Sequence, residues 1–162
     1  MNISRITYRE QIKTSDLAAI ARIVKSSSFF SAAEIDLACE LAGEKLADGK
    51  ASSYQFLFGE DEGFVQGYTC FGLIPATAGS YDLYWIAVDN ACRAQGLGKQ
   101  LLKKTEDIIR SQRGEHIYAE TSSRRQYQAT QRFYESCGYL REAYLKDFYA
   151  AGDSKFIYSK SL

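Results

Sequence analysis

Two glycines, Gly96 and Gly98, stand between a long apolar run at residues 81–88 and a segment whose apolar residues recur at helical spacing. They remove side chains where the chain turns into that helix, and the first amides of a helix lack intrahelical partners. Those amides also carry the positive end of the helix macrodipole, so such a loop can bind a phosphate or pyrophosphate through backbone N–H groups. The same glycines would also permit a tight turn with close packing of helix on strand. The spacing alone leaves both interpretations open.

Two well-known phosphate-binding patterns do not fit this loop. A Walker loop ends in Gly-Lys-Ser/Thr, whereas Gly98 and Lys99 are followed by Gln100. A dinucleotide-binding fold has a G-x-G-x-x-G fingerprint near its first strand and an acidic residue about twenty positions later. The sequence has neither feature. A nucleotide-phosphate site is therefore not predicted.

The sequence around the loop resembles the acetyl-CoA motif of the GNAT superfamily of N-acetyltransferases. The apolar strand ending at residues 86–89 is followed by Arg93-x-x-Gly96-x-Gly98, which is similar to the superfamily pattern. A later segment at residues 133–139, an aromatic-Tyr helix end followed by Gly-aromatic, looks like the second motif. The order of predicted elements is also similar, so the resemblance covers nearly the whole chain.

This resemblance implies a coenzyme A site formed by the loop and by the strand before it. The backbone of Ile86, Ala87 and Val88 would contact the pantetheine arm and the thioester carbonyl. Tyr134 occupies the position of a tyrosine near the thioester sulfur, and Tyr127 stands where many relatives have a pantetheine-contacting asparagine. The Tyr127 hydroxyl can donate a hydrogen bond there. The residues expected to hold the pyrophosphate are Arg93, Ala94, Gln95, Gly96, Leu97, Gly98 and Lys99.

Acetyl transfer to an amine requires a neutral nucleophile, a polarised carbonyl and a protonated leaving group. Because an alkyl amine has a pKa of about 10.4, a carboxylate must take its proton directly or through water. Tyr134 is the candidate acid, and Glu120, at the end of a predicted strand, is the candidate base. Asp82 and Asp147 are rival bases, and Asp82 lies in an apolar strand where a lone carboxylate needs a partner. Tyr134 could instead be a helix-end core aromatic, and Glu120 a solvated surface charge.

The elements that position these residues follow from periodicity and from turn residues. Helices are predicted after Thr14-Ser15, from the capping box at Ser31-Ala-Ala-Glu34, from Gly98 and at residues 128–137, the last one ended by Gly138 as a left-handed cap. Strands are predicted at residues 4–8, 54–59, 64–71, 81–88, 117–120, 140–145 and 155–160. Residues 60–63 are predicted to form a polar hairpin turn, and the last two strands a closing hairpin. The run at 81–88 is predicted to be a central strand buried on both faces. The order β-α-α-β-β-β-α-β-α-β-β predicts a mixed α/β sheet of GNAT type, in a single domain over residues 1–162.

Composition narrows the classes of partner. The chain has 162 residues, a formal net charge of zero and scattered basic residues, which do not favour a nucleic-acid partner. No apolar run reaches membrane length and no signal peptide is evident, so we expect a cytoplasmic protein with reduced cysteines and no membrane contact. With one histidine and four widely separated cysteines, no metal site is expected.

The sequence does not identify the acceptor. We expect a primary amine of a small molecule, amino acid or peptide, which attacks the thioester directly in a ternary complex. A pocket lined by Glu60, Asp61 or Glu120 would suit a polyamine. The alternative function is a non-catalytic acyl-CoA-binding or sensing module that keeps the loop without turnover. A homodimer is expected from the resemblance alone.

Overall fold

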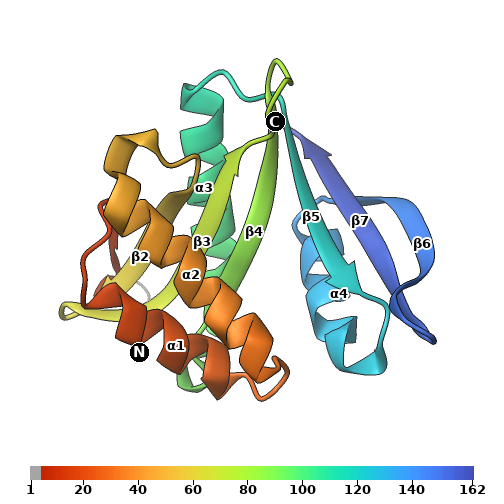
Figure 1. Ribbon diagram of the computed structural model, residues 1–162, viewed down its shortest axis with the longest axis horizontal. Helices are drawn as coiled ribbons and strands as arrows, with labels where there is room; N and C mark the ends of the chain where they lie inside the picture. Colours follow the sequence, from red (N-terminus) through yellow and green to blue (C-terminus); the bar gives the residue numbers. More distant parts are fainter. Residues whose placement is uncertain (1–4) are drawn as a thin grey trace. The chain divides into compact units, whose positions relative to one another are not determined.

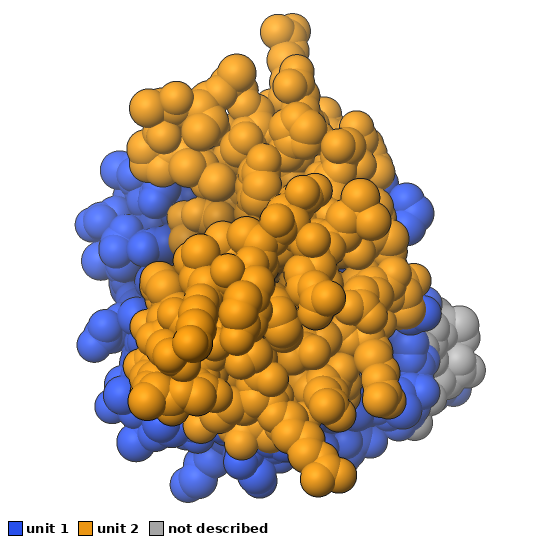
Figure 2. All heavy atoms as spheres, turned by 90° about the vertical axis from the view of Figure 1, so that its right-hand side faces the viewer, with its two compact units in different colours: residues 1–72, 85–107 blue, residues 73–84, 108–162 orange. Residues whose placement is uncertain are grey.

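A computed structural model of the protein describes residues 5–162. Its strands and helices follow the predicted order, and the strands form one mixed sheet in the order β1-β2-β3-β4-β5-β7-β6 (Figure 1). The chain groups into two compact units, shown in separate colours in Figure 2: residues up to 72 with 85–107, and residues 73–84 with 108–162. The unit boundaries fall within β3, β4 and α3. A single domain over residues 1–162 stays a prediction.

The first unit places three helices around antiparallel strands. In Figure 1, α1 and α2 lie on one face of β2 and β3, and α3 lies on the opposite face. Neighbouring strands β1, β2 and β3 pair antiparallel. Its elements are β1 (Thr7–Arg9), α1 (Asp16–Ser26), α2 (Ala32–Asp48), β2 (Gln55–Asp61), β3 (Phe64–Leu73) up to residue 72, the end of β4 (Ser80–Val88) and α3 (Leu97–Ser111) up to residue 107.

Local signals set the helix starts of this unit. At α2, Ser31 Oγ accepts a hydrogen bond from the Glu34 amide at 3.3 Å, and the Glu34 carboxylate accepts one from the Ser31 amide at 2.8 Å, as the predicted capping box requires. At α1, Ser15 is the N-cap residue but its side chain makes no capping hydrogen bond. Asp16, the first residue of α1, instead accepts a hydrogen bond from the Lys13 amide at 2.7 Å, which ties the helix start to the segment before it.

The core of the first unit fills the space between the helices α1 and α2 and the sheet. The aromatic rings of Phe56, Phe58 and Tyr68 stack along neighbouring strands, with centroids 5.8 to 6.4 Å apart. On the other face, Thr69 Oγ1 and Thr105 Oγ1 share a buried hydrogen bond of 2.7 Å. Close approach of β3 to β4 depends on Gly67, where an added Cβ would lie 2.9 Å from the Ala87 carbonyl oxygen. Burial of these side chains supplies most of the driving force that holds α1, α2 and α3 on the sheet.

The second unit contains the start of β4, β5 (His116–Ser122), α4 (Gln128–Ser136), β6 (Leu140–Ala150) and β7 (Asp153–Ser161). The parallel pairing of β4 with β5 joins Ser80–Leu83 to His116–Ala119. Strand β7 pairs antiparallel with both β5 and β6. Helix α4 ends at Gly138, whose φ of +85° is the predicted left-handed cap.

Several boundaries differ from the prediction. The first strand is Thr7–Arg9, and Ser4 lies outside the described residues. The predicted four-residue turn after β2 is shorter, because Glu62 and Gly63 alone take positive φ, as a two-residue hairpin turn requires. The closing hairpin is longer, since β6 continues through a register shift to Ala150.

Strand β4 is not buried on both faces. Burial alternates along it, with Tyr81, Leu83 and Ala87 buried and Tyr84 37% exposed. The prediction was wrong because aromatic residues with a polar edge tolerate partial exposure, so an apolar run alone does not reveal an open face.

Candidate active site

The predicted phosphate cradle is a turn that leads from β4 into α3. Ala94 and Gly96 take left-handed φ values of +59° and +92°. The first intrahelical bond of α3 runs from the Gln100 amide to the Gly96 carbonyl at 3.1 Å. The three preceding amides, at residues 97–99, come before that bond and have no carbonyl partner within the helix. The turn therefore offers backbone donors at the positive end of a fifteen-residue helix.

Helix α1 holds the base of this turn. The Arg22 guanidinium pairs with the Asp89 carboxylate and donates a hydrogen bond to the Val65 carbonyl at 2.6 Å. Ser26 Oγ accepts a hydrogen bond from the Asn90 amide at 3.0 Å. A short 3-10 helix, Asn90–Cys92, opens the turn. Side chains of α1 therefore fix the position of this short helix.

Arg93 connects the turn to the strand before it. Its Nε donates to the Val88 carbonyl at 3.4 Å, and its guanidinium lies 5.5 Å from the centroid of the Phe29 ring. Burial lowers the pKa of Arg93, and the negative charge of Asp89 opposes that shift. The structure thus brings Arg93 together with residues 86–88, which form the end of β4.

In the second unit, Tyr134 is a buried residue of α4. Its ring lies 5.5 Å, between centroids, from both Tyr139 and Tyr158. Burial raises the pKa of Tyr134 well above the usual value of a phenol, so the hydroxyl keeps its proton through the neutral range. Tyr127 ends a short 3-10 helix before α4, is also buried, and has the Arg124 guanidinium 5.7 Å from its ring centroid.

Glu120 does not stand alone on β5. Its Oε2 lies 2.5 Å from Lys155 Nζ, and the Lys155 side chain is only 9% exposed, against 49% for Glu120. Asp82 on β4 belongs to the same group: burial raises the pKa of Asp82, the charge of Glu120 raises it further, and Lys155 opposes the shift. Glu120 therefore pairs directly with the buried Lys155 ammonium, and the charges of both groups act on Asp82.

The other acidic candidates serve different structures. Asp147 has a φ of +51°, and its Oδ1 accepts a hydrogen bond from the Gly152 amide at 2.9 Å within the β6–β7 connection. Glu60 lies in the first unit, where its carboxylate is 2.5 Å from the Arg9 guanidinium. Glu60 is thus already paired within the first unit. An acceptor pocket lined by Glu60, Asp61 or Glu120 stays a prediction.

The acetyltransferase (GNAT) family model matches residues 17–139 of the sequence. The chain belongs to this family. A GNAT-family protein from Desulfovibrio desulfuricans has a crystal structure with 43% identity and a TM-score of 0.94, over 96% of this chain and 98% of that one. The predicted family and mixed α/β fold of this GNAT acetyltransferase are therefore confirmed.

Two more distant structures share the fold of this GNAT acetyltransferase. YncA from Salmonella typhimurium, solved with its cofactor acetyl-CoA, is 22% identical with a TM-score of 0.73, over 97% of this chain and 94% of that one. The PaiA N-acetyltransferase from Thermoplasma acidophilum, solved with coenzyme A, is 18% identical with a TM-score of 0.75, over 97% and 99% of the two chains. No curated protein matches the chain.

Three residues near Glu120 in this GNAT acetyltransferase were not predicted from the sequence to belong to the site. They are Lys155 on β7 and Phe148 and Tyr149 on β6, whose rings lie beside the Lys155 ammonium. The family model ends at residue 139, before either strand. Lys155 pairs with Ser122, two residues after Glu120, so its position near Glu120 depends on the register of β7 against β5. The spacing of residues in the sequence does not predict that register.

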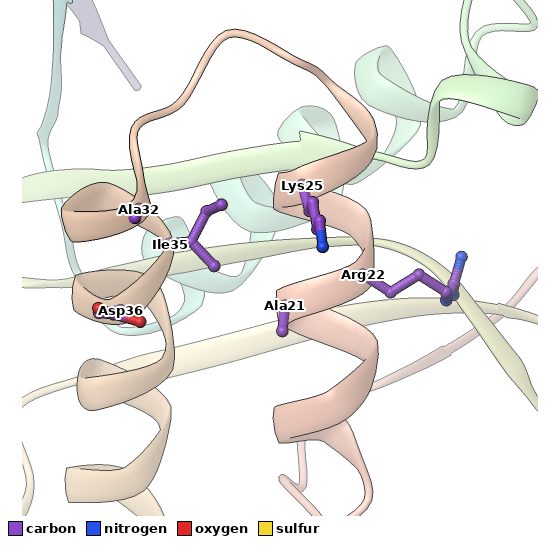
Figure 3. A pocket seen from close by; sticks show the side chains of 6 residues that line it. All are labelled: Ala21, Arg22, Lys25, Ala32, Ile35 and Asp36. Atoms are coloured by element: carbon purple, nitrogen blue, oxygen red, sulfur yellow. The ribbon is translucent and has the colours of Figure 1, made fainter.

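A hollow of about 430 Å³ lies between α1 and α2 and contains none of the predicted site residues. Figure 3 shows Ala21 and Lys25 of α1 facing Ala32 and Ile35 of α2, while Arg22 points away from α2. Its lining joins three small or apolar side chains to the charged side chains of Arg22, Lys25 and Asp36, and the Arg22 guanidinium is engaged with Asp89. We assign it no part in the reaction.

Two further findings concern metals and membranes. Across residues 5–162, no three His, Cys, Asp or Glu side chains gather as a metal site would require. Within the same range, no helix combines the length and the apolar character needed to cross a membrane. All four cysteines are free thiols.

Proposed function

We propose that this GNAT acetyltransferase transfers the acetyl group of acetyl-CoA to a primary amine of a small molecule, amino acid or peptide, by direct attack in a ternary complex. The observation that carries this proposal is the turn at residues 93–99, where Gly96 and the start of α3 present backbone donors. Structures of the same fold hold acetyl-CoA or coenzyme A, which supports the same donor here.

The pyrophosphate is proposed to bind the amides at residues 97–99, with positive charge from Arg93 and Lys99. The chemistry fits, because backbone N–H groups at a helix start bind phosphate and the macrodipole favours negative charge. The backbone of Ile86, Ala87 and Val88, at the end of β4, would hydrogen-bond the pantetheine amides as a neighbouring strand does. Tyr127 remains a proposed pantetheine contact through its hydroxyl.

Tyr134 is proposed to protonate the departing thiolate. Its hydroxyl is protonated at neutral pH, as a phenol ordinarily is, and burial raises its pKa further, so a proton is present for transfer to sulfur. The amine nitrogen first bonds to the carbonyl carbon, and the bond between carbon and sulfur then breaks as the proton of Tyr134 passes to sulfur. The remaining extra proton of the attacking nitrogen returns to the Tyr134 phenolate, directly or through water, which leaves a neutral amide and a neutral thiol. A strand N–H directed at the carbonyl oxygen would stabilise the negative charge that develops there.

Glu120 is proposed to take the proton of the ammonium before or during attack. Its carboxylate is half-exposed, so an amine or a bridging water can reach it. Asp82 is the second candidate, because its raised pKa brings it closer to neutrality and makes it a stronger base than an ordinary aspartate. Asp147 is the third candidate, and water alone is the fourth.

The test is thiol release from acetyl-CoA across a panel of primary amines, measured together with coenzyme A binding by calorimetry. We expect coenzyme A to bind and at least one amine to release thiol above the rate of hydrolysis. Binding without amine-dependent release across the panel would favour the acyl-CoA-binding or sensing module. Stabilisation by ATP in preference to coenzyme A would contradict the assignment of the turn.

Two secondary expectations accompany this function. A cytoplasmic location is proposed because acetyl-CoA is the donor. A homodimer is proposed from the family resemblance, and light scattering on the purified protein tests it.

A further inference from the structure

The second unit contains an ammonium group that is held by aromatic rings and a carboxylate. Lys155 Nζ lies 2.5 Å from Glu120 Oε2, 3.6 Å from the centroid of the Phe148 ring and 5.5 Å from that of Tyr149. The two rings meet edge to face, with centroids 5.0 Å apart. Carboxylates and aromatic faces are the groups that bind alkylammonium ions in proteins. The charge of Asp82 interacts with those of Glu120 and Lys155. We call Asp82, Glu120, Phe148 and Tyr149 the ammonium cage.

A β-bulge positions the rings of this cage. The register of β6 against β7 shifts between Leu145 and Ala150, and a bulge turns side chains away from the regular alternation. Within it, the Asp147 amide donates to Ser154 Oγ at 2.9 Å, and Asp147 Oδ1 accepts from the Gly152 amide at 2.9 Å. The left-handed φ of Asp147 is therefore fixed by two hydrogen bonds directly before Phe148. The rings stand on a defined backbone.

The walls of the cage remain open although Lys155 is buried. Phe148 is 52% exposed and Tyr149 48%, while Glu120 is 49% exposed. The cage also carries excess negative charge, since Asp82 and Glu120 are two carboxylates and Lys155 supplies one positive charge. A second cation can thus reach the cage and is attracted to it.

We propose that the ammonium cage recognises the acceptor, and that it selects a primary alkylammonium on an unbranched aliphatic chain, which competes with Lys155 for Glu120 and the Phe148 ring. The Lys155 side chain is itself such a group, because it has four methylenes that end in an ammonium. Lys155 therefore stands in for the external amine that we expect the cage to bind. An amine that carries carboxylates of its own would be repelled by Asp82 and Glu120. Binding of the amine by the cage does not depend on the proposed function. Only the acetylation of the bound amine rests on the proposed function.

Because Lys155 competes for the same partners, its removal should strengthen binding of the external amine. The probe is n-butylamine, which matches the lysine side chain, and its binding to the full chain is measured by ligand-observed NMR. We expect Lys155→Met to bind n-butylamine about fivefold more tightly, as loss of a competing ion pair and ring contact predicts. We expect Phe148→Ala to bind it about two- to fivefold more weakly.

Phe64→Ala is the matched control, because Phe64 is a 72% exposed phenylalanine on β3 of the first unit. It should leave n-butylamine binding unchanged. Phe148→Leu keeps apolar bulk without a ring and replaces Phe148→Ala if that variant melts early. A structural role of the Lys155–Glu120 pair predicts the opposite pattern: Lys155→Met would lower the melting temperature without tightening n-butylamine binding.

The outcomes separate this inference from the proposed function. Tighter binding by Lys155→Met with weaker binding by Phe148→Ala supports the cage, even if no amine releases thiol from acetyl-CoA. Thiol release that is faster with glutamate than with n-butylamine would overturn the cage and leave the acetyltransferase function standing. Equal binding of n-butylamine by Phe148→Ala and Phe64→Ala would overturn it as well.

Discussion

The turn at residues 93–99 and the ammonium cage recognise charge by different means. The turn binds through backbone amides, and its key residue, Gly96, contributes a φ of +92° and no side chain. The cage uses side chains from the three strands β4, β5 and β6, and Asp82, Glu120 and Phe148 lie far apart in sequence. One site is continuous along the chain, and the other exists only after β5, β6 and β7 have paired.

This difference explains why the sequence indicates the acetyl donor and does not indicate the amine acceptor. A backbone site leaves a glycine pattern at fixed spacing, whereas a side-chain site can be built from any residues that strand pairing brings together. The following experiments ask whether the two regions are as separable as this contrast implies.

The largest effect is expected when the turn is given a side chain. Gly96→Val should lower coenzyme A affinity about 10²- to 10³-fold, because the left-handed φ costs about 1–2 kcal/mol and misplaced amides lose charge-assisted hydrogen bonds worth about 1.5–3 kcal/mol. Calorimetry with coenzyme A measures it. Gly63→Val is the control: Gly63 also has positive φ, at +84°, but in the β2–β3 hairpin, so it should cost stability and spare affinity. Unchanged coenzyme A affinity in Gly96→Val would contradict the proposal that the backbone amides of this turn bind the pyrophosphate.

Tyr134→Phe should lower kcat about 10²-fold, the lower range for loss of a general acid, since a thiol is a good leaving group. Pre-steady-state thiol release measures the chemical step. Tyr158→Phe is matched to it, being a buried tyrosine on β7 whose hydroxyl donates to Glu135 at 3.1 Å. That variant should lose some stability and keep kcat. If both variants keep kcat, Tyr134 is a core aromatic.

Gly67→Ala should destabilise the first unit by about 1–3 kcal/mol, because its Cβ would meet the Ala87 carbonyl oxygen at 2.9 Å. Gly43→Ala should do the reverse: it lies within α2 with open space around its Cβ, and alanine favours a helix by about 1 kcal/mol over glycine. Urea denaturation gives both values. A neutral Gly67→Ala would show that β3 and β4 can separate without cost.

The smallest effect concerns the pH dependence of stability at the cage. The pKa of Asp82 is raised above its ordinary 3.8, so the folded state holds this proton more tightly than the unfolded chain does. Its contribution to stability is therefore fully present below pH 3.8 and is lost as the pH rises through the folded-state pKa. Asp82→Asn should melt higher than the parent protein at neutral pH, with the difference vanishing in acid. A difference independent of pH would show that the Asp82 carboxyl titrates alike in both states.

The parts of the molecule that were predicted correctly rest on local physics. The Ser31–Glu34 capping box, the left-handed Gly138 and the apolar stripe of α3 each depend on residues within a few positions of one another. Strand ends were predicted less well, because β6 extends through a bulge held by Asp147 and Ser154.

For the candidate site, the contrast is sharper. Arg93, Gly96 and Gly98 were found by spacing, and the structure places them at the bend into α3. Glu120 was found by its place at a strand end, but its partner Lys155 was not, because their contact depends on the register of β5 against β7. Asp82 was weighed as a carboxylate in need of a partner, and the pairing of β4 with β5 supplied its neighbours.

The β6–β7 hairpin, residues 140–161, lies entirely beyond the region that the family model matches. It contributes Phe148, Tyr149 and Lys155, while the glycine turn remains upstream. In the proposed ammonium cage this hairpin supplies both aromatic walls and the competing ammonium, while Asp82 and Glu120 come from β4 and β5. Replacing the hairpin would then change the amines that the proposed cage takes and keep the turn at residues 93–99 unaltered.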